Sequence, residues 1–344
     1  MGAHAHGGST MRPTLEAVAA LAGVSRGTVS RVINDSPQVS PKAREAVRRA
    51  IDELGFVPNR AARSLVTQRT DSIALVVSES EERFFGEPYF AAVVRGISSA
   101  LNGTGMQLLL AMAQSPSERD QLEHYLTGQH VDGVLLVSLH GIDTLPELLE
   151  SRGVPTVLNG RPLGTPAAAY VDADNVGGAR QAVEHLAGTG RTRIATITGP
   201  RDMTVGLDRL SGYRDGLRDA GLTVSDDLVG VGDFSLGSGE RGMTALLTRC
   251  PDLDAVFAAS DPMAIGAMRA LRAAGRRVPE DVAVVGFDDS PSALHTDPPL
   301  TTVHQPVEEI GREMVRLLLA RIAGEDVGDP LVILPTHVEV RGSA

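Results

Sequence analysis

The sequence predicts an α/β protein, with a small all-α helix-turn-helix headpiece followed by a body of two Rossmann-like lobes with parallel sheets. Residues 14–34 read TLEAVAALAGVSRGTVSRVIN and place apolar residues at helical spacings on either side of a glycine. From Ile73 onward, short apolar runs alternate with helical periods, which is typical of parallel sheets covered by helices on both faces. Since roughly 270 residues of this alternation exceed one comfortable sheet, we expect two lobes.

The helix-turn-helix motif centres on Gly23, because two short helices must turn sharply there and only glycine takes a positive φ without steric cost. We expect the hydroxyl of Ser25 to cap the second helix. Small apolar residues converge on the inside of the turn: Val18, Ala19, Ala22, Val24, Val29 and Val32. The outward face presents Arg26, Gly27, Thr28, Ser30 and Arg31. This face suits a helix that enters a DNA groove, but an ordinary helical hairpin with a solvated face fits the same pattern.

Charge is divided unevenly along the chain. The whole sequence holds 32 basic and 43 acidic residues, a net charge of −11, whereas residues 11–70 hold ten basic and five acidic residues. That segment therefore carries +5 and leaves −16 for the rest of the chain. Contacts of Lys and Arg with phosphates dominate affinity for nucleic acids, so we expect DNA contact at one end of the molecule only.

A third helix follows the motif. Ser40-Pro41 predicts its start, with serine as the cap and proline at the first helical position. The helix continues on an apolar stripe and ends at Gly55. We therefore place the headpiece at residues 13–57, preceded by a leader at residues 1–12 that we expect to be disordered, with Met11 as a plausible second start.

Residues 58–72 are predicted to form a hinge. Asn59 can cap a short helix from Arg60 to Val66, which is basic on one side. Leu65 lies on this helix without an obvious core to bury it. A plain linker between domains fits the segment as well.

The sequence lacks the signatures of several function classes. It has no phosphate-binding loop, no H-E-x-x-H, no C-x-x-C and no G-x-S-x-G motif, so we expect neither catalysis nor a metal or cofactor. No apolar run reaches the length of a membrane span, and no signal-peptide pattern opens the chain. The single cysteine, Cys250, precludes an intramolecular disulfide. These features predict a cytoplasmic protein without membrane partners.

The body is predicted from its alternation of strands and helices. Candidate strands are Ile73–Val77, Met106–Leu110, Gly133–Val137, Thr156–Leu158, Arg193–Ile197, Ala255–Ala259 and Val282–Phe287. Candidate helices are Arg180–Leu186, Arg209–Ala220, Arg241–Thr248 and Pro262–Ala274. Four of the eleven aromatic residues fall within seven positions after the first strand: Phe84, Phe85, Tyr89 and Phe90. They suit either a wall on which a flat ring stacks or the core side of a helix.

Several motifs together resemble the lactose-repressor/galactose-repressor family: VSRVIN, LGFVPNRAARSL, VDADNVGGARQAVEHL, GLDRLSGYRDGL, ASDPMAIGAMRAL, VAVVGFDDSP and PPLTTVHQP. The resemblance covers nearly everything from Thr14 to Gly342. It implies a transcriptional repressor with a periplasmic-binding-protein-like body, whose affinity for near-palindromic double-stranded operator DNA changes when a small effector binds between the lobes.

The resemblance implies a set of DNA contacts. In such proteins the hinge helix folds only on operator DNA, and a leucine matching Leu65 wedges between base pairs in the minor groove. Arg26 is the expected specificity determinant, because arginine can form two hydrogen bonds with guanine. Gly27 departs from the larger polar residue often found there and is expected to leave one base pair unread. The expected DNA-contacting residues are Thr14, Ser25, Arg26, Gly27, Thr28, Ser30, Arg31, Asn34, Asn59, Arg60, Ala62, Arg63 and Leu65.

For the body, the resemblance implies crossings between the lobes near 170–172, 303–306 and 328–330. The N-terminal lobe then holds residues 73–170 plus 305–328, and the C-terminal lobe holds 171–304 plus 329–344. The cleft between them is expected to bind the effector through Ser78, Phe85, Tyr89, Asn159, Arg209, Phe234, Ser260, Asp288 and Gln305. For Asp261 and Asp289 we prefer a role in capping or turn stabilisation.

The effector remains open at this point. Arginine, aspartate and stacking aromatic residues suit the vicinal hydroxyls of a sugar inducer, while a purine-like corepressor is the main alternative. A sugar-handling α/β enzyme with a DNA-binding head is a remote one. Because two half-sites need two recognition helices, we expect a homodimer. Apolar residues within Tyr89–Leu101 and Pro262–Leu271 suit either its interface or the core.

Overall fold

The computed structural model describes residues 13–33, 36–57, 69–113, 115–164 and 169–344. Contacts divide the chain into two compact units, one ending at Thr70 and the other running from Asp71 to Ala344. The expected leader and the expected hinge helix lie outside the described residues, and so do the expected DNA contacts Asn34, Asn59, Arg60, Ala62, Arg63 and Leu65.

The headpiece consists of three helices around a small apolar core, as predicted. They are α1 (Leu15–Ala22), α2 (Arg26–Ile33) and α3 (Pro41–Leu54). Gly23 ends α1 in the left-handed region at φ 63°, and the Ser25 hydroxyl accepts a hydrogen bond from the Thr28 amide at 3.1 Å. The buried core comprises Val18, Ala19, Val29, Val32, Val47, Ala50 and Phe56.

The first lobe of the body contains a six-stranded parallel sheet in the order β11-β5-β4-β3-β1-β2. Its strands are β1 (Ser72–Val77), β2 (Gln107–Met112), β3 (Gly133–Val137), β4 (Thr156–Asn159), β5 (Tyr170–Ala173) and β11 (Leu331–Leu334). Its helices are α5 (Glu81–Gly86), α6 (Pro88–Leu101), α7 (Pro116–Thr127), α8 (Leu145–Ser151) and α13 (Val307–Ala323).

The second lobe repeats this plan, with the order β12-β10-β9-β8-β6-β7 and one antiparallel pair, β10 with β12. Its strands are β6 (Ile194–Thr198), β7 (Val229–Val231), β8 (Ala255–Ala258), β9 (Ala283–Asp288), β10 (Thr301–His304) and β12 (His337–Glu339). Its helices are α9 (Asn175–Gly188), α10 (Thr204–Asp219), α11 (Leu236–Arg249) and α12 (Asp261–Ala273), with short 3-10 turns at Asp226–Leu228 and Pro291–His295.

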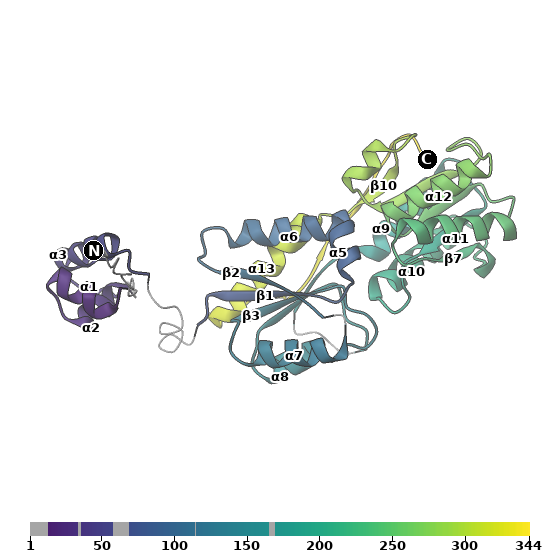
Figure 1. The fold of residues 1–344 in the computed structure, drawn as a ribbon. Coiled ribbons are helices and arrows are strands. Elements are labelled where there is room, and N and C mark those ends of the chain that lie inside the picture. Colours follow the sequence, from purple (N-terminus) through teal and green to yellow (C-terminus); the bar gives the residue numbers. More distant parts are fainter. Residues whose placement is uncertain (1–12, 34–35, 58–68, 114, 165–168) are drawn as a thin grey trace, which may run out of the picture. The chain divides into compact units, whose positions relative to one another are not determined.

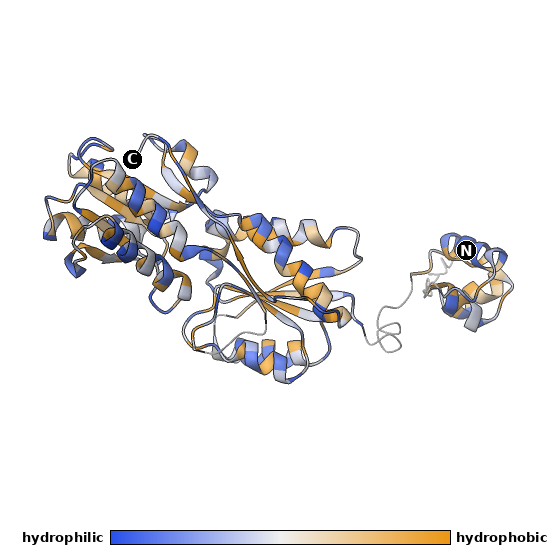
Figure 2. Ribbon diagram, turned by 180° about the vertical axis from the view of Figure 1, so that it is seen from behind, coloured by the Kyte–Doolittle hydropathy of each residue, from blue (hydrophilic) through white to orange (hydrophobic). Residues whose placement is uncertain are grey.

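The central strands of each sheet are buried on both faces, because successive side chains point to opposite sides and helices cover both of them. In β1, Ile73 and Leu75 pack with α6 and α13, while Ala74 and Val76 pack in a separate cluster with residues of α7 and α8. Figure 1 shows these helix pairs on either side of the sheet, and Figure 2 shows the hydrophobic strands between them. The expected α/β class with two parallel-sheet lobes is therefore confirmed.

The lobe boundaries differ from the expected ones at two of the three crossings. The chain leaves the first sheet only after Ala173, since Val171 to Ala173 pair with β11. It returns after His304, within the expected range. Residues 329–334 were expected in the second lobe, but β11 pairs with β5 in the first sheet, so the last crossing follows Leu334. The physical reason is that β11 pairs with the backbone of β5, which would otherwise be an open sheet edge, before the chain crosses to the second lobe.

The apolar residues of α12 belong to the core of their own lobe: Met263, Ala264, Ala267 and Leu271 are fully buried there. Among the described residues, no helix is both long and apolar enough to cross a membrane.

Candidate functional site

A cavity of about 590 Å³ lies between the two lobes, a size typical of small-molecule sites. Residues at the carboxyl ends of strands from both sheets line the cavity, which is where ligand sites of open α/β sheets generally lie. Ser138 and Asn159 come from the ends of β3 and β4, and Ser260 and Asp288 from the ends of β8 and β9. The cavity is therefore built by both lobes.

Arg209 on α10 organises the buried polar side of the cavity. Its Nε donates to the Asn175 side-chain oxygen at 2.9 Å, and one Nη donates to the Asp288 carboxylate at 3.3 Å. Asn175 donates in turn to Asp172 at 2.8 Å, and Gln305 donates to Asp288 at 2.6 Å. We call these five residues the inner network. It offers a ligand charged donors and acceptors whose positions are fixed by one another.

Burial shifts the titration of this network. It raises the pKa of Asp172 to about 6, and it raises the pKa of Asp288 against the opposing charge of Arg209. The Arg209 side chain is 5% exposed, and its guanidinium carbon lies 3.6 Å from the centroid of the Phe287 ring. A charged fork held between an aromatic ring and carboxylates suits a ligand with paired hydroxyl groups.

Aromatic side chains form the less polar wall. Phe234 lines the cavity and is 8% exposed, and its ring packs so tightly on Gly199 that a Cβ there would lie 2.2 Å from the ring. Tyr89 donates its hydroxyl proton to Asn159 at 2.5 Å. Both Phe234 and Tyr89 can therefore support a flat ring.

Strained backbone is concentrated around the cavity. Six described residues other than glycine have positive φ, and four of them line this cavity: Ser138, Phe234, Asp288 and Asp289. Such conformations are costly and tend to cluster at ligand sites, where the surrounding structure enforces them. This supports the cavity as the functional site of the body.

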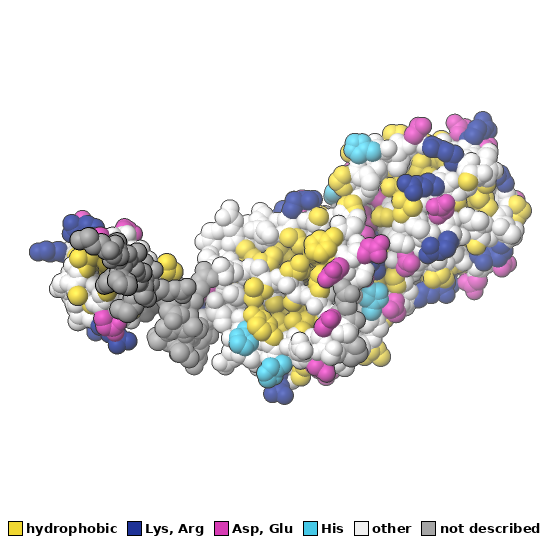
Figure 3. Space-filling model, in the orientation of Figure 1, with side chains coloured by type: hydrophobic (Ala, Val, Ile, Leu, Met, Phe, Trp, Pro, Cys, Tyr) yellow, Lys and Arg dark blue, Asp and Glu magenta, His cyan; other side chains and the backbone are white. Residues whose placement is uncertain are grey.

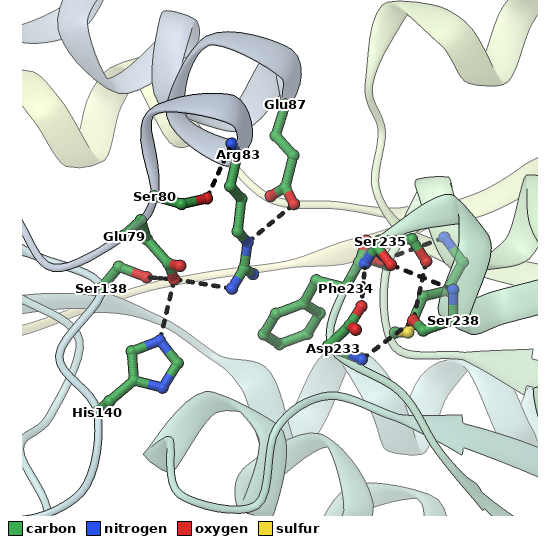
Figure 4. A network of polar contacts seen from close by, with 12 residues as sticks. Glu79, Ser80, Arg83, Glu87, Ser138, His140, Asp233, Phe234, Ser235 and Ser238 are labelled. Atoms are coloured by element: carbon green, nitrogen blue, oxygen red, sulfur yellow. Dashed lines mark hydrogen bonds and ion pairs between the residues drawn. The ribbon is translucent and has the colours of Figure 1, made fainter. Parts of the chain in front are cut away.

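A second group of charged residues lies at the first lobe's side of the cavity (Figure 4). Arg83 on α5 pairs with Glu79 at 2.8 Å and with Glu87 at 2.9 Å. Glu79 also accepts from Ser138 at 2.5 Å and contacts His140 at 3.0 Å. We call these five residues the outer network.

The outer network extends across the lobes. His140 contacts Asp202, which precedes α10 in the second lobe, at 2.9 Å, and the Gly141 amide donates to the Asp202 carbonyl at 2.7 Å. The hydrogen bond with Glu79 raises the pKa of His140. Burial alone would raise the pKa of Glu79, but its hydrogen bonds to His140 and Ser138 lower it. His140 therefore contacts carboxylates of both lobes, and its protonated form is the one that these contacts favour.

Most of the expected effector residues line the cavity, but two do not. Tyr89, Asn159, Arg209, Phe234, Ser260, Asp288 and Gln305 are at its wall. Phe85 is 73% exposed with its ring edge against Phe84, and Ser78 lies outside the lining with its amide bound to the Val137 carbonyl. Phe85 points outward because Phe84 and Phe90 occupy the core side of this segment.

Asp261 and Asp289, for which capping or turn stabilisation was expected, differ in their contacts. Asp261 is fully buried and accepts from the Ser290 amide at 2.6 Å and from the Thr302 hydroxyl at 2.5 Å. Asp289 pairs with Arg341 and contacts His304 at 2.9 Å. Ser260 lines the cavity, yet its hydroxyl also caps α12 by accepting from the Met263 amide.

Several lining residues were not expected from the sequence: Arg83, Glu87, Arg161, Asp172 and Asn175. Asp172 and Asn175 stand in the VDADN motif, whose clustered polar residues at a strand end were an available signal. Nothing in the local pattern distinguishes Arg83 and Glu87 from a solvated helical ion pair one turn apart.

In the headpiece, three of the five residues expected on the outward face of α2 are exposed. Arg26, Gly27 and Arg31 are exposed, whereas Thr28 and Ser30 are half-buried. Arg26 is paired with Glu16 of α1 at 3.1 Å. Thr14 caps α1, since its hydroxyl accepts from the Ala17 amide at 3.3 Å. The N-terminal end of the helix and the exposed arginines of this face suit a phosphate-rich partner.

Comparison with known protein families gives two matches. Residues 14–59 match bacterial regulatory proteins of the lacI family, and residues 183–344 match the periplasmic binding protein-like domain. The two matches fall on the headpiece and on the part of the body that includes most of the second lobe.

Similar individual proteins span almost the whole chain. The HTH-type transcriptional regulator CelR of Thermobifida fusca is 59% identical over 96% of this chain and 98% of its own length. The ribose operon repressor of Escherichia coli K12 is 35% identical over 96% of this chain and 99% of its own length. Among solved structures, a CelR-cellobiose complex is 57% identical with a TM-score of 0.78, covering 97% of this chain and 100% of that one. The lac repressor dimer bound to operator and the anti-inducer ONPF is 29% identical with a TM-score of 0.85, covering 97% and 99%.

Proposed function

Since the chain belongs to the lacI family of bacterial regulatory proteins, a family of DNA-binding transcriptional regulators and not of enzymes, we propose that it is a repressor induced by cellobiose or a closely related glucose disaccharide. The headpiece binds operator DNA through α2, and the sugar binds in the cavity between the lobes. Occupancy of the cavity lowers operator affinity because the sugar binds one lobe arrangement better than the other.

The observation that carries the sugar proposal is the lining of the cavity. Arg209 and Asp288 offer a paired donor and acceptor, and Phe234 offers an aromatic surface beside them. Vicinal hydroxyl groups match the polar pair, and the C–H face of a pyranose ring matches the aromatic ring. The solved CelR-cellobiose complex, at 57% identity, supports a disaccharide of glucose in particular.

The repressor is proposed to act as a homodimer in the cytoplasm, where operator DNA is found. Two headpieces are needed to read the two halves of a near-palindromic operator. In Figure 3, hydrophobic side chains gather on the face of the first lobe that carries α6 and the edge strand β2. On that strand Leu110 is 46% exposed. This face is a better candidate for the dimer interface than α12, whose apolar residues are used in its own lobe.

The test combines calorimetry with operator binding by fluorescence anisotropy at fixed salt. The dimeric protein is titrated with cellobiose, glucose, ribose and hypoxanthine, and an operator is selected from a random duplex library. We expect cellobiose to bind most tightly and to weaken operator binding by about 5- to 150-fold, the range typical of allosteric coupling. By linkage, saturating operator must weaken cellobiose binding by the same factor.

The same experiment separates the alternatives. Tight binding of hypoxanthine with increased operator affinity would establish a purine-like corepressor. Equal cellobiose affinity with and without operator would contradict the inducer mechanism. As a control for the site, Arg209→Met should abolish cellobiose binding, while Arg249→Met, which alters an arginine of the same lobe outside the cavity lining, should not.

A further inference from the structure

The inner and outer networks at the cavity are separate from each other. In the described part of the chain, no hydrogen bond or ion pair joins the inner network around Arg209 to the outer network around Arg83. Both networks nevertheless face the same space, since Arg83 and Glu87 line the cavity together with Arg209 and Asp288. Burial raises the pKa of Glu87 to about 7, and the charge of Asp288 contributes to this rise. A ligand in the cavity therefore has two distinct polar groups available.

Phe234 is common to both groups. The centroid of its ring lies 5.8 Å from the guanidinium carbon of Arg209 and 5.5 Å from that of Arg83. Arg209 and Phe234 belong to the second lobe and Arg83 to the first, so each lobe contributes one charged donor beside this ring. Figure 4 shows the Arg83 guanidinium next to the Phe234 ring and in contact with Glu79 and Glu87.

Arg83 and Glu87 are held in place and still have atoms to offer. Arg83 is 17% exposed, and its bonds to described residues use Nε and one terminal nitrogen. Glu87 uses one carboxylate oxygen in the same pairing. The remaining guanidinium nitrogen can donate and the remaining oxygen can accept. Such a preorganised donor and acceptor pair fits two neighbouring hydroxyl groups without the entropic cost of ordering free side chains.

We propose that Arg83 and Glu87 form a second sugar-ring subsite, which binds the outer ring of a disaccharide while Arg209 and Asp288 bind the inner ring. The inference rests on the proposed function and specifies which residues set the preference for chain length. A monosaccharide in the inner subsite leaves Arg83 and Glu87 to water, so these residues add affinity for a disaccharide only. Selectivity is this difference between two binding free energies.

The test measures the ratio of cellobiose affinity to glucose affinity in the intact dimer. Cellobiose is titrated directly, and glucose is measured by displacement of cellobiose so that weak binding still gives a value. We expect Arg83→Gln and Glu87→Gln to reduce this ratio, Arg83→Gln by about tenfold or more, as for loss of a hydrogen bond to a charged group. Arg83→Lys should restore part of the ratio, because it retains a charged donor.

Two further variants exclude indirect effects. His140→Asn disturbs the outer network away from the cavity and should affect both sugars alike. Arg119→Gln removes an ion-paired arginine of the same lobe on α7, outside the cavity lining, and should leave both affinities unchanged. A thermal melt confirms that each variant is folded.

The outcomes are distinguishable from a failure of the proposed function. If cellobiose does not bind the unmodified protein, the proposed function is wrong and the subsite falls with it. If cellobiose binds but Arg83→Gln leaves the affinity ratio unchanged, or weakens both sugars equally, the second subsite is wrong while the proposed function stands.

Discussion

Replacing Arg26 by alanine is the sharpest test of how the headpiece reads DNA. The Arg26 side chain lies at the start of α2 and is 72% exposed. It forms an ion pair with Glu16, which is itself 61% exposed. A surface ion pair of this kind contributes little to stability. The variant headpiece should therefore remain folded, and any change in operator binding should come from a lost DNA contact.

The size of the effect follows from the chemistry of base recognition. A bidentate contact between arginine and guanine discriminates against a wrong base by about 1–3 kcal/mol, or about 5- to 150-fold in affinity. Arg26→Ala should therefore lose that preference at one base pair in each half-site. At the other positions the pattern of preferred bases should persist.

The assay is fluorescence anisotropy with a set of operators that each carry one base-pair change, at several salt concentrations. Arg49→Ala is the matched control, because it removes an exposed positive charge from α3 without altering α2. If Arg26→Ala weakens all operators equally and reduces the salt dependence by about one phosphate contact, Arg26 contacts the backbone and the assignment is wrong.

Three further predictions follow from the described contacts. Hydrogen bonds with Glu79 and, second, with Asp202 raise the folded pKa of His140, so the stabilisation from these contacts is present at low pH and lost as pH rises through that raised value. The melting temperature of the unmodified protein should exceed that of His140→Asn by more at pH 6 than at pH 8.5. A constant difference would contradict this. Gly27→Ala should stabilise the headpiece by about 0.5–1 kcal/mol in chemical denaturation, because alanine favours the helix and its Cβ would meet only one atom, at 3.7 Å. A loss of stability would contradict this prediction. Gly96→Ala should destabilise the body by about 1–3 kcal/mol, since its Cβ would lie 2.1 Å from a backbone carbonyl oxygen of α13. In the control Gly86→Ala, the new Cβ meets nothing within 4 Å. Equal unfolding midpoints of the two variants would refute the reasoning.

Local signals explain why the headpiece was predictable in detail. Gly23 and Ser25 determine a turn and a cap through their own backbone and side-chain chemistry, and the helical spacing of Val29 and Val32 identifies the buried face. These interactions span only a few residues. The sequence therefore contains nearly all the information that fixes this unit.

Strands were predictable where they are buried on both faces and long enough to form an apolar run. Gly133–Val137 was predicted with its observed bounds, and β1 with one residue fewer. Five short strands were missed: Tyr170–Ala173, Val229–Val231, Thr301–His304, Leu331–Leu334 and His337–Glu339. Each has only three or four residues, and three of them lie at a sheet edge, where the partner defines a strand more than its own composition does. The last crossing was misplaced for the same reason.

The sequence by itself determined the architecture, the helix α2 that we propose to face DNA and, by resemblance, the arginine and aspartate of the inner network. Only the tertiary structure decided which neighbouring residues share the cavity. It turned Phe85 outward and brought Arg83 of the first lobe to the Phe234 ring of the second, 151 positions away along the chain. The physical reason is that local propensity acts over a few residues, whereas a ligand site depends on where separate strands end and on what packs between them.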